Sequence, residues 1–324
     1  MELTLAFNDQ LFTQLSVNGV TRGSLYALIA LGYTMVYGIL KLLNFAHGDV
    51  YMIGAFVGYG LLSGLGGPLS PNLALTPLII LMFLGAMLAS GFLGVAIERF
   101  AYRPLRDAPR LAPLISALGV SFFLQNSVLL LFGADFRTYN SFVLGSPNPE
   151  FFEPGPLTDP LFKIGGVNVQ LIQVVVLAMT VVLMIALTVL VARTRIGKAM
   201  RATAYDREGA MMMGIDVDRV IASTFFIGSM LAGAAGVMFG LLFSQIFHFM
   251  GFLAGLKGFT AAVVGGIGSI PGAMLGGLLV GLTESYAEGY LGGRWSDLTV
   301  FGILILVLLV RPSGLLGAKA IQKV

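Results

Sequence analysis

The polar run Leu43–Asp49 stands between two strongly apolar stretches and holds side chains that could contact a solute. Within it, Asn44, His47, Gly48 and Asp49 interrupt the hydrophobic pattern. Polar groups at membrane depth are costly and usually face a bundle interior or a path through it. The run is therefore either an unwound stretch lining a translocation path, or a surface turn whose Asn or Asp caps the next helix. One His and one Asp are too few ligands for a metal site.

An amide pair, Gln125 and Asn126, lies inside the apolar segment 111–133. These side chains either line the path or form hydrogen bonds between neighbouring helices. Two acidic residues, Glu284 and Glu288, stand one helical turn apart, and their position predicts a solvated helix face near the outer end of a span rather than a proton relay.

The loop from Arg193 to Arg219 is basic at its start and mixed afterwards. Its pattern predicts a short amphipathic helix over Lys198–Met213 that Gly214 stops. Asp216 or Asp218 then caps the following helix. Such a helix lies flat on the membrane surface or docks into the groove of a partner, and composition alone favours the surface.

A glycine-rich run spans Gly255–Ala273 and includes Lys257. It predicts a broken or re-entrant segment over 253–270, because the run Gly265–Pro271 at its end does not hold a regular helix. A membrane tolerates such irregular backbone where protein or a water-filled cavity surrounds it. The pairs Gly272/Gly276 and Gly277/Gly281 have the spacing of tightly packed helices. The sequence contains no G-x-x-x-x-G-K-[ST] phosphate loop, so any ATP chemistry must come from a partner chain.

The elements that position these residues must lie in lipid. Of 324 residues, 57% are hydrophobic and 11% are charged, whereas a soluble domain has roughly 25% charged residues. We expect an all-α polytopic membrane protein with about eight transmembrane helices, including broken or re-entrant segments, in one transmembrane domain over 1–324. The expected apolar segments are roughly 18–41, 48–66, 73–97, 111–133, 170–192, 220–243, 253–270, 271–291 and 296–310.

Basic residues predict the orientation, because loops rich in Lys and Arg stay in the cytoplasm. They cluster at three places: Arg99, Arg103, Arg106 and Arg110; then Arg193, Arg195, Lys198, Arg201, Arg207 and Arg219; then Arg311, Lys319 and Lys323. The stretch 134–169 is acidic and rich in Pro and Gly, so we place it outside with irregular or short β structure. The N-terminus is then outside and the C-terminus cytoplasmic.

Two other classes of function compete with a transport subunit. A membrane-embedded enzyme needs a clustered catalytic set, and no cysteine, two histidines and scattered carboxylates argue against one. We therefore expect no catalytic residue, cofactor or metal. A passive channel would share the hydrophobicity and the broken helices, but it would not need a docking helix.

These features, in this order, resemble the H-type permease of the high-affinity branched-chain amino-acid ABC transporters. The resemblance runs from about residue 14 to 317 and is least in the loop 134–169. The stretches that carry it are Asn18–Phe56, Ile97–Arg110, Leu114–Asn126, Arg201–Ile221, Gly255–Gly281 and Leu304–Leu316.

The resemblance implies a multi-pass protein of the bacterial inner membrane that imports leucine, isoleucine or valine. Its implied partners are a homologous second permease, two ATP-binding subunits and a periplasmic binding protein; we expect no nucleic acid. It also implies that the cytoplasmic loop 193–219 couples to the ATPases, with roles for Arg201, Asp206, Glu208, Ala210 and Gly214. For the path we expect Asn44, His47, Gly48, Gln125 and Asn126. A related permease for urea or short amides is the nearest rival.

Overall fold

The computed structural model describes residues 9–65, 75–106, 108–109, 111–139 and 160–317. Helices dominate these residues. The α-helices are α1 (Asp9–Leu40), α2 (His47–Leu65), α3 (Leu75–Ile97), α4 (Leu111–Phe132), α5 (Leu171–Arg193), α6 (Arg195–Tyr205), α7 (Arg207–Met212), α8 (Val217–Phe243), α9 (Met250–Gly265), α10 (Ile270–Tyr286) and α11 (Gly293–Val310). The shorter elements are the π-helical turns η1 (Glu98–Tyr102) and η3 (Ala287–Leu291), the 3-10 turn η2 (Arg103–Leu105), and the strands β1 (Arg137–Thr138), β2 (Pro160–Ile164), β3 (Val167–Gln170) and β4 (Gln245–Ile246).

Six described helices, α1, α3, α4, α5, α8 and α11, are long and apolar enough to cross a membrane, and α9 is a shorter apolar helix. The prediction of an all-α polytopic membrane protein is confirmed. α1 is already helical at Asp9, before the expected start near residue 18, and these first turns mix polar residues with Leu11, Phe12 and Leu15.

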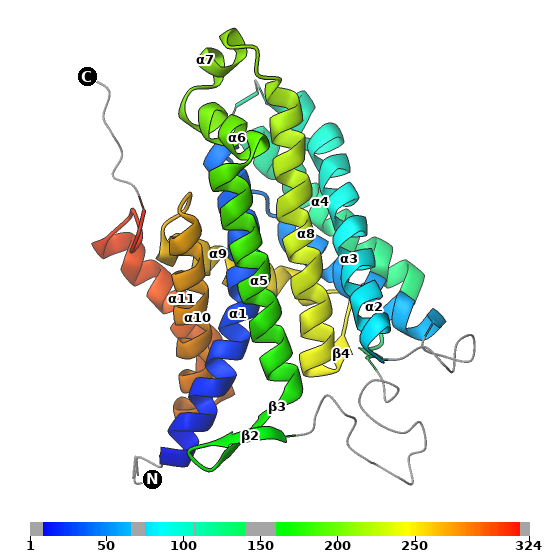
Figure 1. Cartoon of the computed structure of the whole chain (residues 1–324), viewed down its shortest axis with the longest axis vertical. Helices are drawn as coiled ribbons and strands as arrows, with labels where there is room; N and C mark the ends of the chain where they lie inside the picture. Colours follow the sequence, from blue (N-terminus) through cyan, green and yellow to red (C-terminus); the bar gives the residue numbers. More distant parts are fainter. Residues whose placement is uncertain (1–8, 66–74, 107, 110, 140–159, 318–324) are drawn as a thin grey trace.

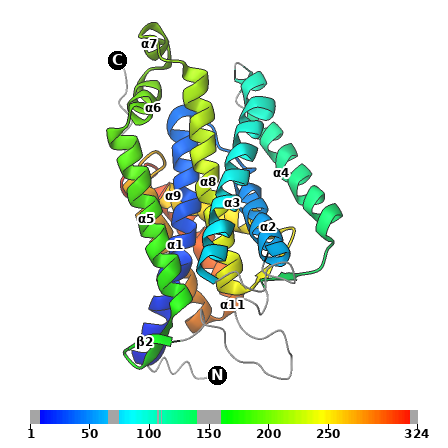
Figure 2. The same cartoon turned by 45° about the vertical axis from the view of Figure 1, so that its right-hand side comes forward.

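The helices run between two distinct ends of the molecule (Figure 1). At one end α6 and α7 project beyond the bundle, and we call this the α6–α7 end. At the other, the hairpin end, lie the start of α1 and the antiparallel hairpin β2–β3. The central helices α1 and α8 are largely buried, while α5 and α11 are mostly exposed. After a turn of the view, α4 lies on the outer flank, where it packs against α2 (Figure 2).

Short β structure is found in the described parts of the stretch 134–169, as predicted. β1 pairs with β4, and β2 pairs with β3, in two small antiparallel sheets. Residues 140–159 of this stretch lie outside the described residues.

The glycine-rich segment is broken where its sequence predicts, within the run Gly265–Pro271, and is helical before it. α9 is a continuous helix of 16 residues, since neighbouring helices support it. The break is confined to the turn after it, where Gly266 and Gly268 have φ of +108° and +96°. Only glycine adopts this region freely. Ser269 then caps α10, accepting a 3.2 Å hydrogen bond from the Gly272 amide.

The two predicted glycine pairs do serve close packing, on two faces of α10. Side chains added at Gly272 or Gly276 would collide with the backbone of α9, and ones at Gly277 or Gly281 would collide with the backbone of α1. Backbones in such contact gain dispersion energy that lipid alone does not supply. The result is a tight three-helix unit of α1, α9 and α10.

The segment between α5 and α8 forms two helices, α6 and α7, so the prediction of a single helix over Lys198–Met213 is wrong. Asp206 is extended, with φ of −148°, and its carboxylate accepts hydrogen bonds from the amides of Glu208 and Gly209, each 3.1 Å long. Because the Asp206 side chain caps the start of α7, the chain bends at this residue and α6 does not continue. Gly214 ends the helical run with φ of +80°, as predicted, and Asp216 rather than Asp218 caps α8.

Candidate functional site

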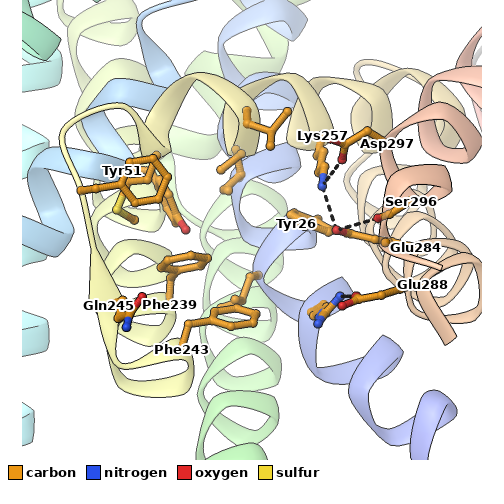
Figure 3. Close-up of a pocket in the computed structure, with 18 of the residues that line it drawn as sticks. Tyr26, Tyr51, Phe239, Phe243, Gln245, Lys257, Glu284, Glu288, Ser296 and Asp297 are labelled. Atoms are coloured by element: carbon orange, nitrogen blue, oxygen red, sulfur yellow. Dashed lines mark hydrogen bonds and ion pairs between the residues drawn. The ribbon is translucent and has the colours of Figure 1, made fainter. Parts of the chain in front are cut away.

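A cavity of about 490 Å³ opens among α1, α2, α8, α9, α10 and α11, toward the hairpin end. This volume lies in the range of small-molecule sites. Its walls differ in chemistry: Figure 3 shows Tyr51, Phe239 and Phe243 on one side and Lys257, Glu284, Ser296 and Asp297 on the other.

The charged wall centres on Lys257 of α9. Its Nζ lies 2.8 Å from Glu284 Oε1 of α10 and 2.7 Å from Asp297 Oδ1 of α11. Ser296 Oγ also donates to Glu284 Oε1, at 3.4 Å. The Lys257 and Glu284 side chains are each only 7% exposed. Charges this deep persist only when they are paired, and they mark functional sites in membrane proteins.

A second ion pair extends this wall toward the hairpin end. Arg22 of α1 bonds Glu288, one turn beyond Glu284 on the helical run that follows α10. The predicted solvated face is therefore wrong for Glu284, which the start of α11 covers, whereas Glu288 is half-exposed. The sequence could not show this cover, because it depends on how α11 folds back over α10.

The aromatic wall comes from α2, α8 and the β4 turn. Tyr51 packs edge-on against Phe239 with ring centroids 5.9 Å apart. The ring centroids of Phe239 and Phe243 are 4.5 Å apart. Phe247 also lines the cavity. The guanidinium of Arg22 lies 5.6 Å from the centroid of the Phe243 ring, so the charged and aromatic walls meet there. A cavity of this kind can hold a solute that has both charged and apolar parts.

An aromatic cluster lies one helical turn inward from two cavity-lining residues. Tyr33 follows Ile29 by one turn on α1, and His47 precedes Tyr51 by one turn on α2. The rings of Tyr33 and His47 meet at 4.8 Å, and Phe259 packs against both Tyr33 and Phe45. Along α1 this cluster, Tyr33, Phe45, His47 and Phe259, lies between the cavity-lining residues and the α6–α7 end.

The predicted path residues of the first polar run lie at or beside this cluster. Asn44 forms the turn before α2, where its Oδ1 accepts from the Ala46 amide at 3.2 Å and its carbonyl accepts from the His47 amide. Among the described residues, Asn44 Nδ2 and His47 Nε2 are buried and have no hydrogen-bond partner. Gly48 lies where α2 crosses α9, and a Cβ there would collide with the Gly251 carbonyl.

The predicted amide pair is split between two environments. Gln125 is buried and donates to Asp49 Oδ1 at 3.0 Å and to Ser121 Oγ at 3.2 Å, and Ser121 also donates to Asp49. This network joins α4 to α2. Asn126 is on the exposed face of α4 and donates to the Phe122 carbonyl. None of the five predicted path residues is among the side chains that line the cavity.

The α6–α7 end carries the predicted coupling residues. Ala210 is buried on α7, and Glu208 and Arg201 are exposed; Arg201 donates to the Val191 carbonyl at the end of α5. Asp206 and Gly214 shape the backbone, as described above. Beside them is a group of large exposed side chains with 51–85% exposure: Tyr205, Met211, Met212 and Met213. Exposed Met and Tyr are typical of protein interfaces.

Ion pairs connect this end to the turn after α3. Arg106 bonds both Glu98 and Asp218, and Arg103 bonds Asp218. Asp218 lies in the first turn of α8, which follows directly on α7. Arg106 and Glu98 are buried, with side chains 6% and 3% exposed, while Arg103 is open. The start of α8 is thereby fixed to the connection between α3 and α4.

The ionic wall was missed at the sequence level. The one available signal was Lys257, a cation inside an apolar segment, which by itself calls for a buried acidic partner. Its partners Glu284 and Asp297 are remote in sequence, and only the packing of α9 against α10 and α11 identifies them.

Comparison with known proteins gives a consistent result. Residues 15–309 match the family model described as branched-chain amino acid transport system / permease component. The chain is 44% identical over 317 residues to the high-affinity branched-chain amino acid transport system permease proteins BraD of Pseudomonas aeruginosa and LivH of Escherichia coli K12, covering 97% of this chain and 98% of each relative. It is 30% identical over 303 residues to a probable branched-chain amino acid transport permease protein of Methanocaldococcus jannaschii, covering 91% of this chain and 89% of the relative. No solved structure matches.

Proposed function

Because the chain belongs to the family of permease components of branched-chain amino acid transport systems, we propose that it carries leucine, isoleucine or valine into the cell as one membrane subunit of an ATP-driven importer. The observation that carries the proposal is the α6–α7 projection with its exposed Tyr205 and Met211–Met213. A channel has no use for such a surface, whereas an importer must transmit force from a separate ATPase.

The proposed assembly pairs this chain with a homologous second permease. Two ATP-binding subunits dock at the α6–α7 end, and a binding protein outside the membrane delivers substrate at the hairpin end. The α6–α7 end then faces the cytoplasm of a bacterial inner-membrane protein, with the C-terminus on the same side. Its basic residues support this orientation, although Arg110, Lys319 and Lys323 lie outside the described residues.

For coupling, we assign the five predicted residues separate tasks. Asp206 and Gly214 set the bend and the end of α7, and Ala210 packs its inner face. Arg201 joins α6 to the end of α5, and Glu208 is free to contact the ATPase. Movement of the ATPases then shifts α6 and α7 against the start of α8.

For the path, substrate enters the cavity from the hairpin end and proceeds past the aromatic cluster. Asn44 and His47 there offer unpaired polar groups to a passing solute. Gly48 supports the crossing of α2 and α9, and Gln125 supports α2 through Asp49. Asn126 faces away from this route, so we assign it no contact with substrate.

The test uses the assembled importer in proteoliposomes, with ATPase activity and uptake as readouts. Cognate binding protein is added with leucine, isoleucine, valine or urea, one at a time. Stimulation by the aliphatic amino acids alone supports the proposal. Stimulation by urea alone overturns the substrate class, and uptake without any ATPase subunit favours a channel.

A surface variant tests the docking role directly. Met212→Glu places a charge on the exposed apolar tip, and we expect loss of ATPase co-purification. Leu161→Glu, at an apolar residue 55% exposed at the hairpin end, is the control. Equal recovery of ATPase with both variants would contradict docking at α6–α7.

A further inference from the structure

One oxygen of the charged wall accepts no hydrogen bond of normal geometry. Glu284 Oε1 accepts from Lys257 and Ser296, whereas Oε2 is buried and lies outside hydrogen-bonding geometry of every described donor. The phenol of Tyr26, which also lines the cavity, lies against the same carboxylate. An ionised carboxylate oxygen deprived of donors is costly at this depth. Glu284 is among the cavity-lining residues, so a ligand there can supply the missing donor.

The formal charges of the wall point to the same kind of donor. Two cations, Arg22 and Lys257, line the cavity together with three carboxylates, Glu284, Glu288 and Asp297. The surplus is one negative charge. A primary ammonium group has three donors and a positive charge, and it therefore fits Glu284 Oε2 in both respects.

A complementary anion site lies one helical turn away. Arg22 uses Nη1 for Glu288, and a guanidinium has five N–H donors in a planar fork. Glu288 is half-exposed, so its share of the ion pair is readily replaced by another carboxylate. Because Glu284 and Glu288 are a turn apart, the two anchor points are about 5 to 6 Å apart along the helix. An α-amino acid that donates at one end and accepts at the other spans this separation.

The wall opposite these anchors suits an apolar side chain. Phe239, Phe243 and Phe247 face the cavity, and the Arg22 guanidinium lies beside the Phe243 ring. Transfer of each aliphatic carbon from water to such a wall is favourable. The cavity thus offers an acceptor for an ammonium group, a donor for a carboxylate and an apolar wall for an aliphatic side chain, which are the three parts of an aliphatic α-amino acid.

We infer that this cavity is a binding site for a zwitterionic α-amino acid with an aliphatic side chain, with the ammonium on Glu284 Oε2, the carboxylate on Arg22 and the side chain against the three phenylalanines. The inference rests on the proposed function and deepens it. The permease then recognises the amino-acid backbone within its own bundle, in addition to any selection by the binding protein. Lys257 positions Glu284, and Ser296 holds the oxygen that does not contact the ligand.

The experiment is photolabelling of the complete importer, with its binding protein, during ATP turnover. The probe is a diazirine analogue of L-leucine, and peptide mass spectrometry locates the attached carbon. We expect labels on Phe239, Phe243 or Phe247 that excess L-leucine suppresses. Glu284→Gln keeps an oxygen for Lys257 but lacks the charge, and we expect about tenfold less labelling, as for loss of one charge-assisted hydrogen bond.

Glu98→Gln is the matched control, since it removes an equally buried and paired carboxylate at the other end of the molecule. Labelling of the cavity should persist in this variant. Thermal melting of the purified complex shows that each variant is folded, and the wild-type labelling positions give a result that depends on no variant.

Undiminished labelling in folded Glu284→Gln would overturn the inference. So would wild-type labels confined to other positions. If wild-type importer takes up leucine yet never labels the cavity, the inference fails while the proposed function stands. If it takes up no aliphatic amino acid, the proposed function itself fails.

Discussion

The imidazole of His47 meets the phenol ring of Tyr33 edge-on, with ring centroids 4.8 Å apart and planes at 65°. The contact depends on Gly32, because a Cβ at that position would overlap the His47 ring. Both rings are buried, and they come from helices that run in opposite directions. The contact lies one helical turn inward of the cavity-lining residues Ile29 and Tyr51.

Truncating this contact should make the protein leak. His47→Ala removes the ring and leaves space beside the unpaired amide of Asn44, where water can enter. We expect efflux of leucine from preloaded liposomes, without ATP, to rise several-fold. The control is His248→Ala, at the other histidine of the chain, and its leucine efflux should equal that of the wild type. Unchanged leucine efflux in both variants would show that the His47–Tyr33 contact does not block the path.

The crossing of α2 and α9 should tolerate no side chain. In Gly48→Ala the new methyl group collides with the Gly251 carbonyl and Gly255, and we expect a loss of about 1–3 kcal/mol. Gly60→Ala, on the same helix with open space around it, should gain about 0.5–1 kcal/mol from helix propensity. The measurement is the free energy of unfolding of each variant in detergent, compared with the wild type. Equal changes for Gly48→Ala and Gly60→Ala would contradict close backbone contact at the crossing of α2 and α9.

Two arginines that share Asp218 should differ sharply in importance. Arg106→Gln leaves buried Glu98 without its cation, which costs about 3–5 kcal/mol. Arg103→Gln breaks an exposed pair, worth about 0–1 kcal/mol. Denaturant unfolding of each variant measures the difference. A similar small loss in both would mean that Glu98 finds another partner.

The adjacent amides Gln125 and Asn126 form a matched pair for substitution. Gln125→Ala removes a donor to buried Asp49 and should cost about 1–3 kcal/mol, with reduced uptake because α2 loses a contact with α4. Asn126→Ala, on the exposed face, should fall within about ±0.5 kcal/mol. Loss of uptake in Asn126→Ala alone would return that side chain to the path.

The bend between α6 and α7 should require an acceptor at Asp206 rather than a charge. Asp206→Ala removes the cap and should cost about 1 kcal/mol locally, lowering the leucine imported per ATP hydrolysed. Asp206→Asn keeps an oxygen for the Glu208 and Gly209 amides and should retain coupling. If Asn fails as Ala does, the carboxylate acts through its charge on a partner.

Features that depend on local sequence were predictable. Gly214 ends a helix because it adopts positive φ, and Asp216 caps the next one, since both effects involve only neighbouring residues. The glycine spacing in α10 predicted close packing, although not which helix meets which face. Asp206 was hidden, because a capping residue inside an amphipathic pattern looks like one more polar position.

Features that depend on tertiary pairing were not predictable. The sequence predicts a solvated Glu284, and only the placement of α9 and α11 beside it shows that its side chain is buried. The position of Asn126 relative to Gln125 follows from a helical step of about 100°. Gln125 rather than Asn126 is buried because α2 packs against the Gln125 face of α4, and the sequence alone does not place α2 there.

The glycine contacts that join α1 to α10 and α10 to α9 have a mechanical consequence. Backbone pressed on backbone has no rotamers to exchange, so these three helices form a stiff unit. They carry Arg22, Glu284 and Lys257. Glycines make the same kind of contact between α2 and α8, where a Cβ at Gly54 or Gly236 would collide with the backbone of the other helix. The phenylalanines opposite belong to the end of α8 and the turn after it. Glycine contacts therefore hold the helices on both sides of the cavity, so the volume offered to an aliphatic chain changes through the rotamers of the side chains that line it rather than through separation of these helices.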